Sequence, residues 1–439
     1  MIRKKQENTL TWKNILQFLK EYGFLIQSDE IYGGLFSVYN SGPASVELKN
    51  QIKKEWWNFF VKQKSFIYGF ESSILTHAQT LKASGHVDRF IDSFYLCKNC
   101  GYHQNTEDLI KKIDQKRICF KCKKINNFKH FEYNLLFETQ QGVEEGKKNK
   151  IYLRPETAQG IFTNFNKIKQ IWKINLPFGL GQIGKAFRNE LTTKYANFKS
   201  CEFEMLEIEF FFANKKDSLK WFNYWKKEIW TFLQTNLKIK KQNIKEQEAS
   251  SADLAHYAQK TVDFEYKFPF GWKEIWGLCD RGDYDLTKHQ SLSKTNLSVL
   301  HGKKQEKIIP YVIEPSAGVE RLMLAMIVEN LKYKEDKFTL QLPFAFCYYQ
   351  IAILPLTEKL KPIAEKITKI LEKNYSLKLD AKKSIGKRYL FHDAIGTFFC
   401  ITVDFETNKD QKVTIRNRDT KKQKRVTIKD LNQHIQNEL

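Results

Sequence analysis

Residues 184–210 carry charged side chains at spacings that suit work on a phosphate. They read as two strands joined by a polar loop, the first ending in Arg188-Asn189-Glu190 and the second running on from Phe198. Because side chains alternate along a strand, we expect Arg188 and Glu190 on one face. A guanidinium there can hold a phosphate under attack, while the carboxylate holds an amino group.

The second of these strands is rich in carboxylates for such an apolar stretch. By the same alternation, Glu204 shares a face with Leu206, whereas Glu207 shares the other face with Phe203 and Met205. Buried charges need partners. A hairpin held together by salt bridges is the alternative, and it explains so many carboxylates poorly.

A third element, residues 311–325, reads as a strand, a glycine turn and a helix. Arg321 falls in the first turn of this helix, beside the positive end of the dipole, where an anion would sit. Alone, the glycine turn is a weak signal. Together with the hairpin, it becomes a strong signal for a site that binds an anion.

Four cysteines form a second chemical pattern. Cys97-Lys-Asn-Cys100 and Cys119-Phe-Lys-Cys122 are two knuckles whose spacing allows four thiolates to surround one ion, and zinc suits them best. Such a site has no open position, so it is expected to be structural. Two coincidental reduced pairs are the alternative. The other four cysteines are scattered and suggest no disulfide framework, which favours a reducing cytoplasm.

Composition sets wider limits. The chain has 439 residues, 42% of them hydrophobic, which is enough for two or three domains. Its net charge of +23 favours a polyanionic partner, although codon bias is the alternative, since Lys, Ile, Asn and Phe are all abundant. We expect no membrane span, because no stretch of about eighteen apolar residues occurs. Trp12, Ile15 and Leu19 repeat at helical spacing and predict a core-facing helix rather than a transit peptide.

The order of elements predicts a larger α+β body followed by a small α/β module. A charged run at residues 332–337 precedes apolar strand patterns at 349–354, 398–403 and 412–416, with an amphipathic helix at 358–375. The cysteine segment looks like an insertion into the larger body. A polar stretch around residues 236–251 looks like a second insertion, exposed at the surface.

The hairpin and the strand–turn–helix element resemble parts of class II aminoacyl-tRNA synthetases. Phe187-Arg188-Asn189-Glu190, with its loop and Phe203, resembles motif 2, and Gly318-Val-Glu320-Arg321 resembles motif 3. Further strings are similar to glycyl-tRNA synthetases of the single-polypeptide, dimeric type: Leu153-Arg-Pro-Glu156-Thr-Ala-Gln-Gly160, Phe270-Gly-Trp-Lys-Glu274-Ile-Trp-Gly277, Asp283-Tyr-Asp-Leu286, Glu314-Pro-Ser316, Tyr32-Gly-Gly-Leu35 and Lys383-Ser-Ile-Gly-Lys-Arg-Tyr389. This resemblance extends over nearly the whole chain.

The resemblance implies a role for each site residue. Arg188 would bind the α-phosphate of ATP, Glu190 would read the adenine amino group, and Arg321 would hold the terminal phosphate; these three are the expected catalytic residues. Phe203 would stack on adenine, and Glu274 with Ile275 would line the nucleotide site and help to bind Mg²⁺. The expected nucleotide set is Arg188, Asn189, Glu190, Phe198, Lys199, Phe203, Glu274, Ile275, Gly318 and Arg321. The expected glycine set is Glu156, Phe203, Glu204, Glu207, Glu314, Ser316 and Gly318.

The implied reaction is the ATP-dependent activation of glycine, followed by its transfer to the 3′ end of tRNA(Gly). Glycine offers no side chain to grip, so carboxylates around its ammonium group must supply the affinity. Alanine must then be rejected by a steric wall. A cluster of carboxylates without a cation is costly, so we expect some of these glutamates to be protonated in the free enzyme.

The implied architecture has three parts: an antiparallel sheet flanked by helices, a zinc-bound insertion, and a C-terminal α/β anticodon-binding domain. We expect a catalytic domain over residues 1–345, with insertions at 93–130 and 212–255, and an anticodon domain over 346–439. The resemblance also implies a homodimer, with tRNA(Gly) as the partner. Candidate anticodon contacts are Lys387, Arg388, Arg416 and Arg418, although a solvated basic face is the alternative for each.

This chain departs from the family pattern in two places. The stretch from Gly101 to Glu107 lacks the basic residues expected in that segment, and the other departure lies in the loop of motif 2. Where the family usually has arginines, this chain has Lys199, which keeps the charge but loses the planar fork, and Cys201, which loses both. Two rival functions follow. One is a synthetase of another specificity, against which the string at residues 153–160 argues. The other is a non-catalytic nucleic-acid binder such as a polymerase accessory subunit, which has no need of Arg188, Glu190, Glu314 and Arg321.

Overall fold

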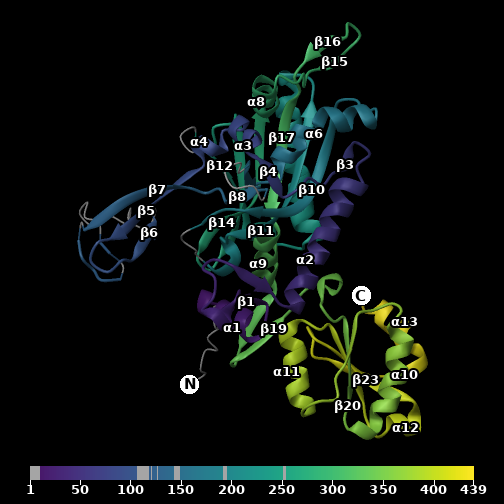
Figure 1. The fold of residues 1–439 in the computed structure, drawn as a ribbon. Coiled ribbons are helices and arrows are strands. Elements are labelled where there is room, and N and C mark those ends of the chain that lie inside the picture. The colour runs from purple at the N-terminus through teal and green to yellow at the C-terminus, as the bar shows by residue number, and fades with distance from the viewer. Residues whose placement is uncertain are drawn as a thin grey trace.

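The chain folds into a large α+β body and a smaller C-terminal α/β body (Figure 1). The computed structural model describes residues 10–105, 118–119, 121–125, 127–142, 149–190, 195–250 and 254–439. Parts of the two predicted insertions, residues 106–117, 120, 126 and 251–253, lie outside these ranges. Among the described helices, none is long and apolar enough to cross a membrane. The predicted α+β class with a C-terminal α/β unit is confirmed.

A seven-stranded sheet forms the centre of the large body, in the order β12-β13-β14-β17-β11-β10-β3. Neighbouring strands are antiparallel, except that β3 runs parallel to β10. The predicted hairpin is present, with Phe178 opposite Phe211 and Phe187 opposite Glu202. The strands are β3 (Ile67–Gly69), β10 (Phe178–Phe187), β11 (Glu202–Phe212), β12 (Ile244–Glu248), β13 (Lys260–Phe268), β14 (Gly271–Gly282) and β17 (Tyr311–Gly318).

The two faces of this sheet have different neighbours. Helices α2 (Pro43–Trp56), α7 (Ser218–Thr231) and α9 (Val319–Asn330) share one core with the even-numbered side chains of β11, which are Leu206, Ile208, Phe210 and Phe212. On the other face, α6 (Ala158–Ile171) and α8 (Tyr284–Ser293) share a second core with Phe211. The odd-numbered side chains at the start of β11 are left facing a cavity: Phe203, Met205 and Glu207.

Several smaller elements surround this body. The N-terminal helix α1 (Trp12–Glu21) packs on the main core, as its spacing predicts. A three-stranded sheet made of β5 (Ile91–Cys97), β6 (His103–Asn105) and β7 (Phe128–Asn134) projects from the body (Figure 1). The remaining elements here are β1 (Leu25–Gln27), β2 (Tyr39–Ser41), β4 (Leu75–His77), α3 (Ala78–Ala83), α4 (His86–Arg89), β8 (Glu138–Gln141), β9 (Asn149–Leu153), β15 (Val299–His301), β16 (Glu306–Ile308), β18 (Leu331–Lys334) and β19 (Lys337–Leu340).

Segment 212–255, expected to be an insertion, contributes to the main core through α7. Phe222, Trp225 and Ile229 of this helix are all buried there. The polar residues that follow include β12, which forms one edge of the central sheet.

The C-terminal body has its own sheet, in the order β21-β20-β22-β23-β24, and its own buried core. Strands β20, β21 and β22 are parallel, and β23 and β24 continue the sheet in antiparallel fashion. The elements are β20 (Ile351–Pro355), α10 (Lys361–Leu371), β21 (Leu377–Leu379), α11 (Ile385–Ile395), β22 (Phe399–Val403), α12 (Thr407–Asp410), β23 (Lys412–Asn417), β24 (Gln423–Thr427) and α13 (Leu431–Asn437).

Candidate active site and metal centre

A cavity of about 770 Å³ lies over the uncovered part of the central sheet. Strands β11, β14 and β17 contribute to its wall, and the stretch before β11 forms one rim. Most of the residues predicted for the nucleotide and glycine sites line it: Glu156, Arg188, Glu190, Phe198, Lys199, Phe203, Glu207, Glu274, Glu314, Ser316, Gly318 and Arg321. The structure therefore brings the segments that carry these residues together around one cavity.

Three predicted residues lie outside this lining. Glu204 is on the helical face of β11, where Lys49 and Lys53 of α2 each lie 2.9 Å from its carboxylate. Ile275 is fully buried in the main core. Asn189 follows Arg188, and its backbone N–H donates to the carbonyl of Leu135 at 2.7 Å. For Glu204 this corrects the expected contact with glycine, because side-chain alternation places it on the opposite face of the strand from Glu207.

Arg188 and Glu190 lie just beyond the end of β10. The guanidinium of Arg188 is 5.3 Å from the centroids of both the Phe203 and the Phe90 rings. Its Nε donates to a backbone carbonyl, that of Pro155, at 3.1 Å. The Nζ of Lys199 lies 2.8 Å from the carboxylate of Glu190, so the residue that departs from the family pattern neutralises a predicted substrate contact.

Arg321 is the third residue of α9, at the helix N-terminus where it was predicted. Its guanidinium carbon is 4.7 Å from the centroid of the Phe198 ring, and its Nη1 donates to the carboxylate of Glu274 at 2.8 Å. Arg188 and Arg321 therefore face the same cavity from two separate elements. That arrangement places positive charge, a helix dipole and aromatic rings around one space.

Three carboxylates of the cavity lining, Glu156, Glu207 and Glu314, lie near Arg281 of β14, and two of them contact its guanidinium directly. Arg281 is fully buried; its Nη1 donates to Glu314 and its Nη2 lies 3.5 Å from Glu156. Its Nε donates to Asp285 at 2.8 Å. One guanidinium is thus shared among three carboxylates. Glu207 instead accepts the backbone N–H of Thr157 at 2.8 Å, and among the described residues its Oε1 has no hydrogen-bond partner.

The carboxylates in this cluster differ in their affinity for protons. Burial raises the pKa of Glu207 to about 8, and the charges of Glu314 and Glu156 act in the same direction. Burial also raises the pKa of Glu314, although Arg281 opposes it. For Glu156, burial alone would raise the pKa, but the charges of His86 and Arg281 outweigh it and lower the pKa. This agrees with the expectation that part of the cluster is protonated when no ammonium group is bound.

Sequence reasoning missed several residues of the site. Arg281 lies two residues before the quoted string Asp283-Tyr-Asp-Leu286, but no local signal marks it as the centre of the acidic cluster. Glu209 is fully buried, and within the described part of the chain neither of its carboxylate oxygens has a hydrogen-bond partner. Asp263 lines the cavity too, and burial together with the charges of Glu274 and Glu265 raises its pKa to about 7.

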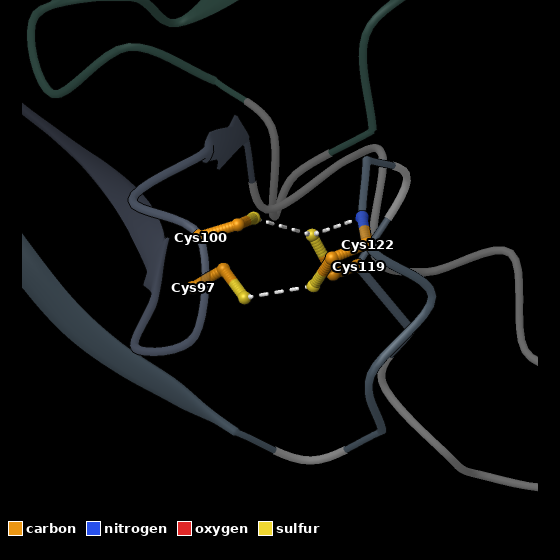
Figure 2. A group of neighbouring side chains, drawn as sticks. All are labelled: Cys97, Cys100, Cys119 and Cys122. Atoms are coloured by element: carbon orange, nitrogen blue, oxygen red, sulfur yellow. Dashed lines mark hydrogen bonds between the residues drawn. The ribbon is translucent and has the colours of Figure 1, made fainter.

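The four cysteines of the projecting sheet form a compact cluster (Figure 2). Their sulfur atoms all lie within 4.8 Å of one another. Cys97 and Cys122 are 3.5 Å apart, and Cys100 and Cys119 are 3.6 Å apart. Four thiolates about 2.3 Å from a central zinc ion are separated by about 3.8 Å in a regular tetrahedron. The donor set and its spacing therefore fit zinc.

The four predicted anticodon contacts fall into two groups. Lys387 on α11 is exposed, and Arg416 on β23 is half-buried in a two-pronged ion pair with Asp393, at 2.8 and 2.9 Å. Arg388 and Arg418 are buried and donate to backbone carbonyls inside the body. The contact expected of those two arginines with RNA is therefore corrected: their guanidinium groups tie elements of the fold together.

Two family models match the chain. Residues 137–330 match the tRNA synthetase class II core domain (G, H, P, S and T), and residues 350–438 match the anticodon binding domain. These two matches correspond to the large body with its cavity and to the C-terminal body.

Curated relatives extend the similarity over almost the entire length. The chain is 44% identical to a glycine–tRNA ligase of Mycoplasma capricolum, over 95% of this chain and 97% of that protein. It is 40% identical to a glycine–tRNA ligase of Alkaliphilus oremlandii, over 98% of each chain. A glycine–tRNA ligase of Clostridium beijerinckii is 41% identical, over 97% of this chain and 98% of its own.

Proposed function

This chain belongs to the glycine–tRNA ligases of the class II synthetases, and we propose that glycine and ATP meet in the cavity between Arg188, Arg321 and the carboxylate cluster. The chain activates glycine with ATP to give glycyl-adenylate and transfers the glycyl group to tRNA(Gly). One observation carries the assignment of the site: two guanidinium groups from separate elements line a single cavity together with an acidic cluster.

In our proposal the nucleotide lies across the outer part of the cavity. Arg188 contacts the α-phosphate, and the adenine ring lies against Phe203, whose ring already has a guanidinium beside it. Arg321, backed by Phe198 and close to Gly318, holds the terminal phosphate. Glu190 accepts a hydrogen bond from the adenine amino group. Lys199, whose Nζ pairs with the Glu190 carboxylate, lies beside that hydrogen bond.

Glycine lies at the inner end of the cavity. Its ammonium group is held by Glu156, Glu207 and Glu314, with Ser316 beside them on β17. The free Oε1 of Glu207 is the acceptor that supports this placement. Arg281 fixes the positions of Glu156 and Glu314, since both carboxylates form ion pairs with its guanidinium. Glu204 takes no part, because it faces α2.

The reaction needs positioning and charge more than acid–base catalysis. The glycine carboxylate attacks the α-phosphorus in line, a new P–O bond forms, and the bond to pyrophosphate breaks. Arg188 stabilises the charge that spreads over the α-phosphoryl oxygens, and Arg321 stabilises the departing pyrophosphate. The 3′-terminal hydroxyl of tRNA then attacks the carbonyl of the adenylate and releases AMP.

The same cavity has residues that fit Mg²⁺. Glu274 and Asp263 both line it, and hard carboxylate oxygens together with substrate phosphates are the ligands this ion prefers. The negative charges of Glu274 and Glu265, which both act on Asp263, support this assignment because they would attract a cation. When bound, Mg²⁺ would neutralise charge on the phosphates.

For the cysteine cluster we propose a structural zinc ion. Cys97, Cys100, Cys119 and Cys122 would complete its coordination, leaving no position for a substrate. Its role would be to fix the β6–β5–β7 sheet, which buries few apolar residues of its own.

We further propose the division into a catalytic domain, residues 1–345, and an anticodon domain, residues 346–439. The two core clusters support it, although Phe346, Cys347 and Ala394 of the second domain pack in the first cluster. Exposed apolar side chains on residues 31–36 support a homodimer: Ile31, Tyr32, Leu35 and Phe36. Eight unpaired thiols and the family membership support a place in the cytoplasm.

Exchange of pyrophosphate into ATP tests the site. We expect exchange with glycine and none with alanine. Arg188→Gln should reduce exchange about a hundredfold or more, because a preorganised charge at the reacting phosphate is lost. Lys185→Gln is the matched control, three residues earlier on β10 and outside the cavity. If no amino acid supports exchange, the nucleic-acid binder is favoured. If Arg188→Gln and Lys185→Gln reduce exchange equally, Arg188 has no special role in the reaction.

A further inference from the structure

The backbone that enters β11 adopts an unusual conformation beside the cavity. Tyr195 has φ 60° and ψ 49°, and the next residue, Ala196, has φ 59°. Residues with a β-carbon rarely adopt this left-handed conformation, and two in succession require support from the surrounding structure. The contacts of Tyr195 show where that support comes from.

The ring of Tyr195 is clamped between two other elements. It stacks on Phe270, in the turn between β13 and β14, with centroids 3.7 Å apart and ring planes only 6° from parallel. The Trp12 ring of α1 meets both of these rings edge-on, at 5.9 Å from Tyr195 and 4.9 Å from Phe270. The two edge-on contacts of Trp12 have a geometry that aromatic rings favour, and they hold the face-to-face stack of Tyr195 and Phe270 from one side.

This cluster continues to the arginine that we assign to the terminal phosphate. Phe198 contacts Phe270 edge-on at 5.7 Å, and the guanidinium of Arg321 lies 4.7 Å from the centroid of the Phe198 ring. The Nε of Arg321 also faces the carbonyl of Phe198 at 3.4 Å. A continuous series of contacts therefore runs from the N-terminal helix to the cavity.

Trp12 is not what holds α1 on the protein. Ile15, Phe18 and Leu19 of the same helix are almost completely buried in the main core, whereas Trp12 is only partly buried. The helix start is fixed locally by the side chain of Thr11, which accepts the backbone N–H of Asn14 at 3.3 Å. The indole is thus carried by an already anchored helix and is directed at Tyr195 and Phe270.

We propose that Trp12 is a positioning residue for the nucleotide half of the active site. It clamps Tyr195 against Phe270, and this holds Phe198 and Arg321 in place for the terminal phosphate of ATP. The inference rests on the proposed function only in placing ATP at this end of the cavity. It predicts a selective effect on ATP, because the glycine carboxylates lie on β11, β17 and the residues before α6, away from the clamp.

The test is the Michaelis constant for each substrate in pyrophosphate exchange by the full chain. Trp12→Ala should raise the KM for ATP about three- to tenfold, the effect of losing one or two aromatic pairs, and leave the KM for glycine unchanged. Trp12→Phe should restore most of the affinity for ATP. Tyr195→Gly, which keeps the backbone conformation but removes the ring, should raise the KM for ATP as Trp12→Ala does, with no further rise in the double variant.

Leu19→Ala is the control for loosening of α1. It removes a buried contact of the same helix and should lower the melting temperature while leaving the KM for ATP unchanged. An unchanged KM for ATP in Trp12→Ala would overturn the proposal, and so would an equal rise in Leu19→Ala or a parallel rise in the KM for glycine. Exchange by the unmodified chain establishes the proposed function separately, so its failure is distinguishable from failure of the clamp.

Discussion

If Glu207 holds the glycine ammonium group as proposed, we expect glycine binding to depend on pH. Burial and the charges of Glu314 and Glu156 raise its pKa to about 8, so in the free protein it is mostly protonated at neutral pH. In the proposed glycine site, the ammonium group binds the ionised carboxylate of Glu207, so the proton would have to leave first. The apparent dissociation constant for glycine is then the intrinsic constant divided by the fraction of molecules in which Glu207 is ionised.

With a pKa of about 8, roughly one molecule in eleven carries an ionised Glu207 at pH 7, and roughly half do at pH 8. The KM for glycine should therefore fall roughly tenfold from pH 6 to pH 7 and roughly fivefold from pH 7 to pH 8. Glu207→Gln removes the titrating group, so it should raise the KM for glycine at pH 8 and flatten this profile.

Stability gives a second readout of the same group. Its pKa in the folded state, about 8, lies above the ordinary glutamate value of 4.5, so between these two pH values the folded state binds more protons than the unfolded state. Stability from this group is therefore present at low pH and is lost as pH rises toward 8. Without glycine, the melting temperature of Glu207→Gln should change less over this interval than that of the unmodified chain.

The assay is pyrophosphate exchange from pH 6 to pH 8, with the KM for glycine measured at saturating ATP. Glu204→Gln is the matched control: it removes the same charge from the same strand, but on the face toward α2. A KM for glycine that is the same at pH 6.5 and pH 7.5 would refute the argument. An equally flattened profile in Glu204→Gln would show that Glu207 is not the titrating group.

Two further predictions concern the metal and the C-terminal body. The purified chain should contain about one zinc ion, and Cys100→Ser should lose it while Cys400→Ser, a buried lone thiol, retains it; elemental analysis showing an active but metal-free protein would count against the site. Lys387→Ala should raise the KM for tRNA in aminoacylation without changing glycine-dependent exchange or the melting temperature. Arg418→Ala should instead lower stability by about 1–3 kcal/mol for each buried carbonyl it leaves unpaired, measured by chemical denaturation; the reverse pattern in these two variants would contradict their placement.

Alternation along β11 shows how far local sequence could be taken. It correctly separated Glu204 and Leu206 from Phe203, Met205 and Glu207, because successive side chains of a strand point to opposite faces. It did not decide which of these faces lines the cavity. The choice of face depends on α2, which brings Lys49 and Lys53 to Glu204. Lys53 and Glu204 are 151 residues apart in the chain.

The C-terminal arginines illustrate the same limit. Arg388, Arg416 and Arg418 look alike in sequence, as basic residues in a basic chain. In the folded body, one is paired with Asp393 and the other two donate to backbone carbonyls inside the body. A buried guanidinium has five N–H donors for such acceptors. A residue that could contact RNA by its type alone therefore stabilises the fold instead.

By itself, the sequence determined the α+β architecture, the presence of Arg188 and Arg321 at one cavity, the four cysteines that cluster together and the family. These features rest on local spacing and on strings of residues that stay together in the chain. Only the tertiary structure decided that Arg281 lies at the centre of the carboxylates, that Glu207 rather than Glu204 faces the cavity, and that Trp12 reaches Tyr195. The reason is physical: charge pairing, burial and ring contacts depend on which distant segments meet, and no local pattern encodes those meetings.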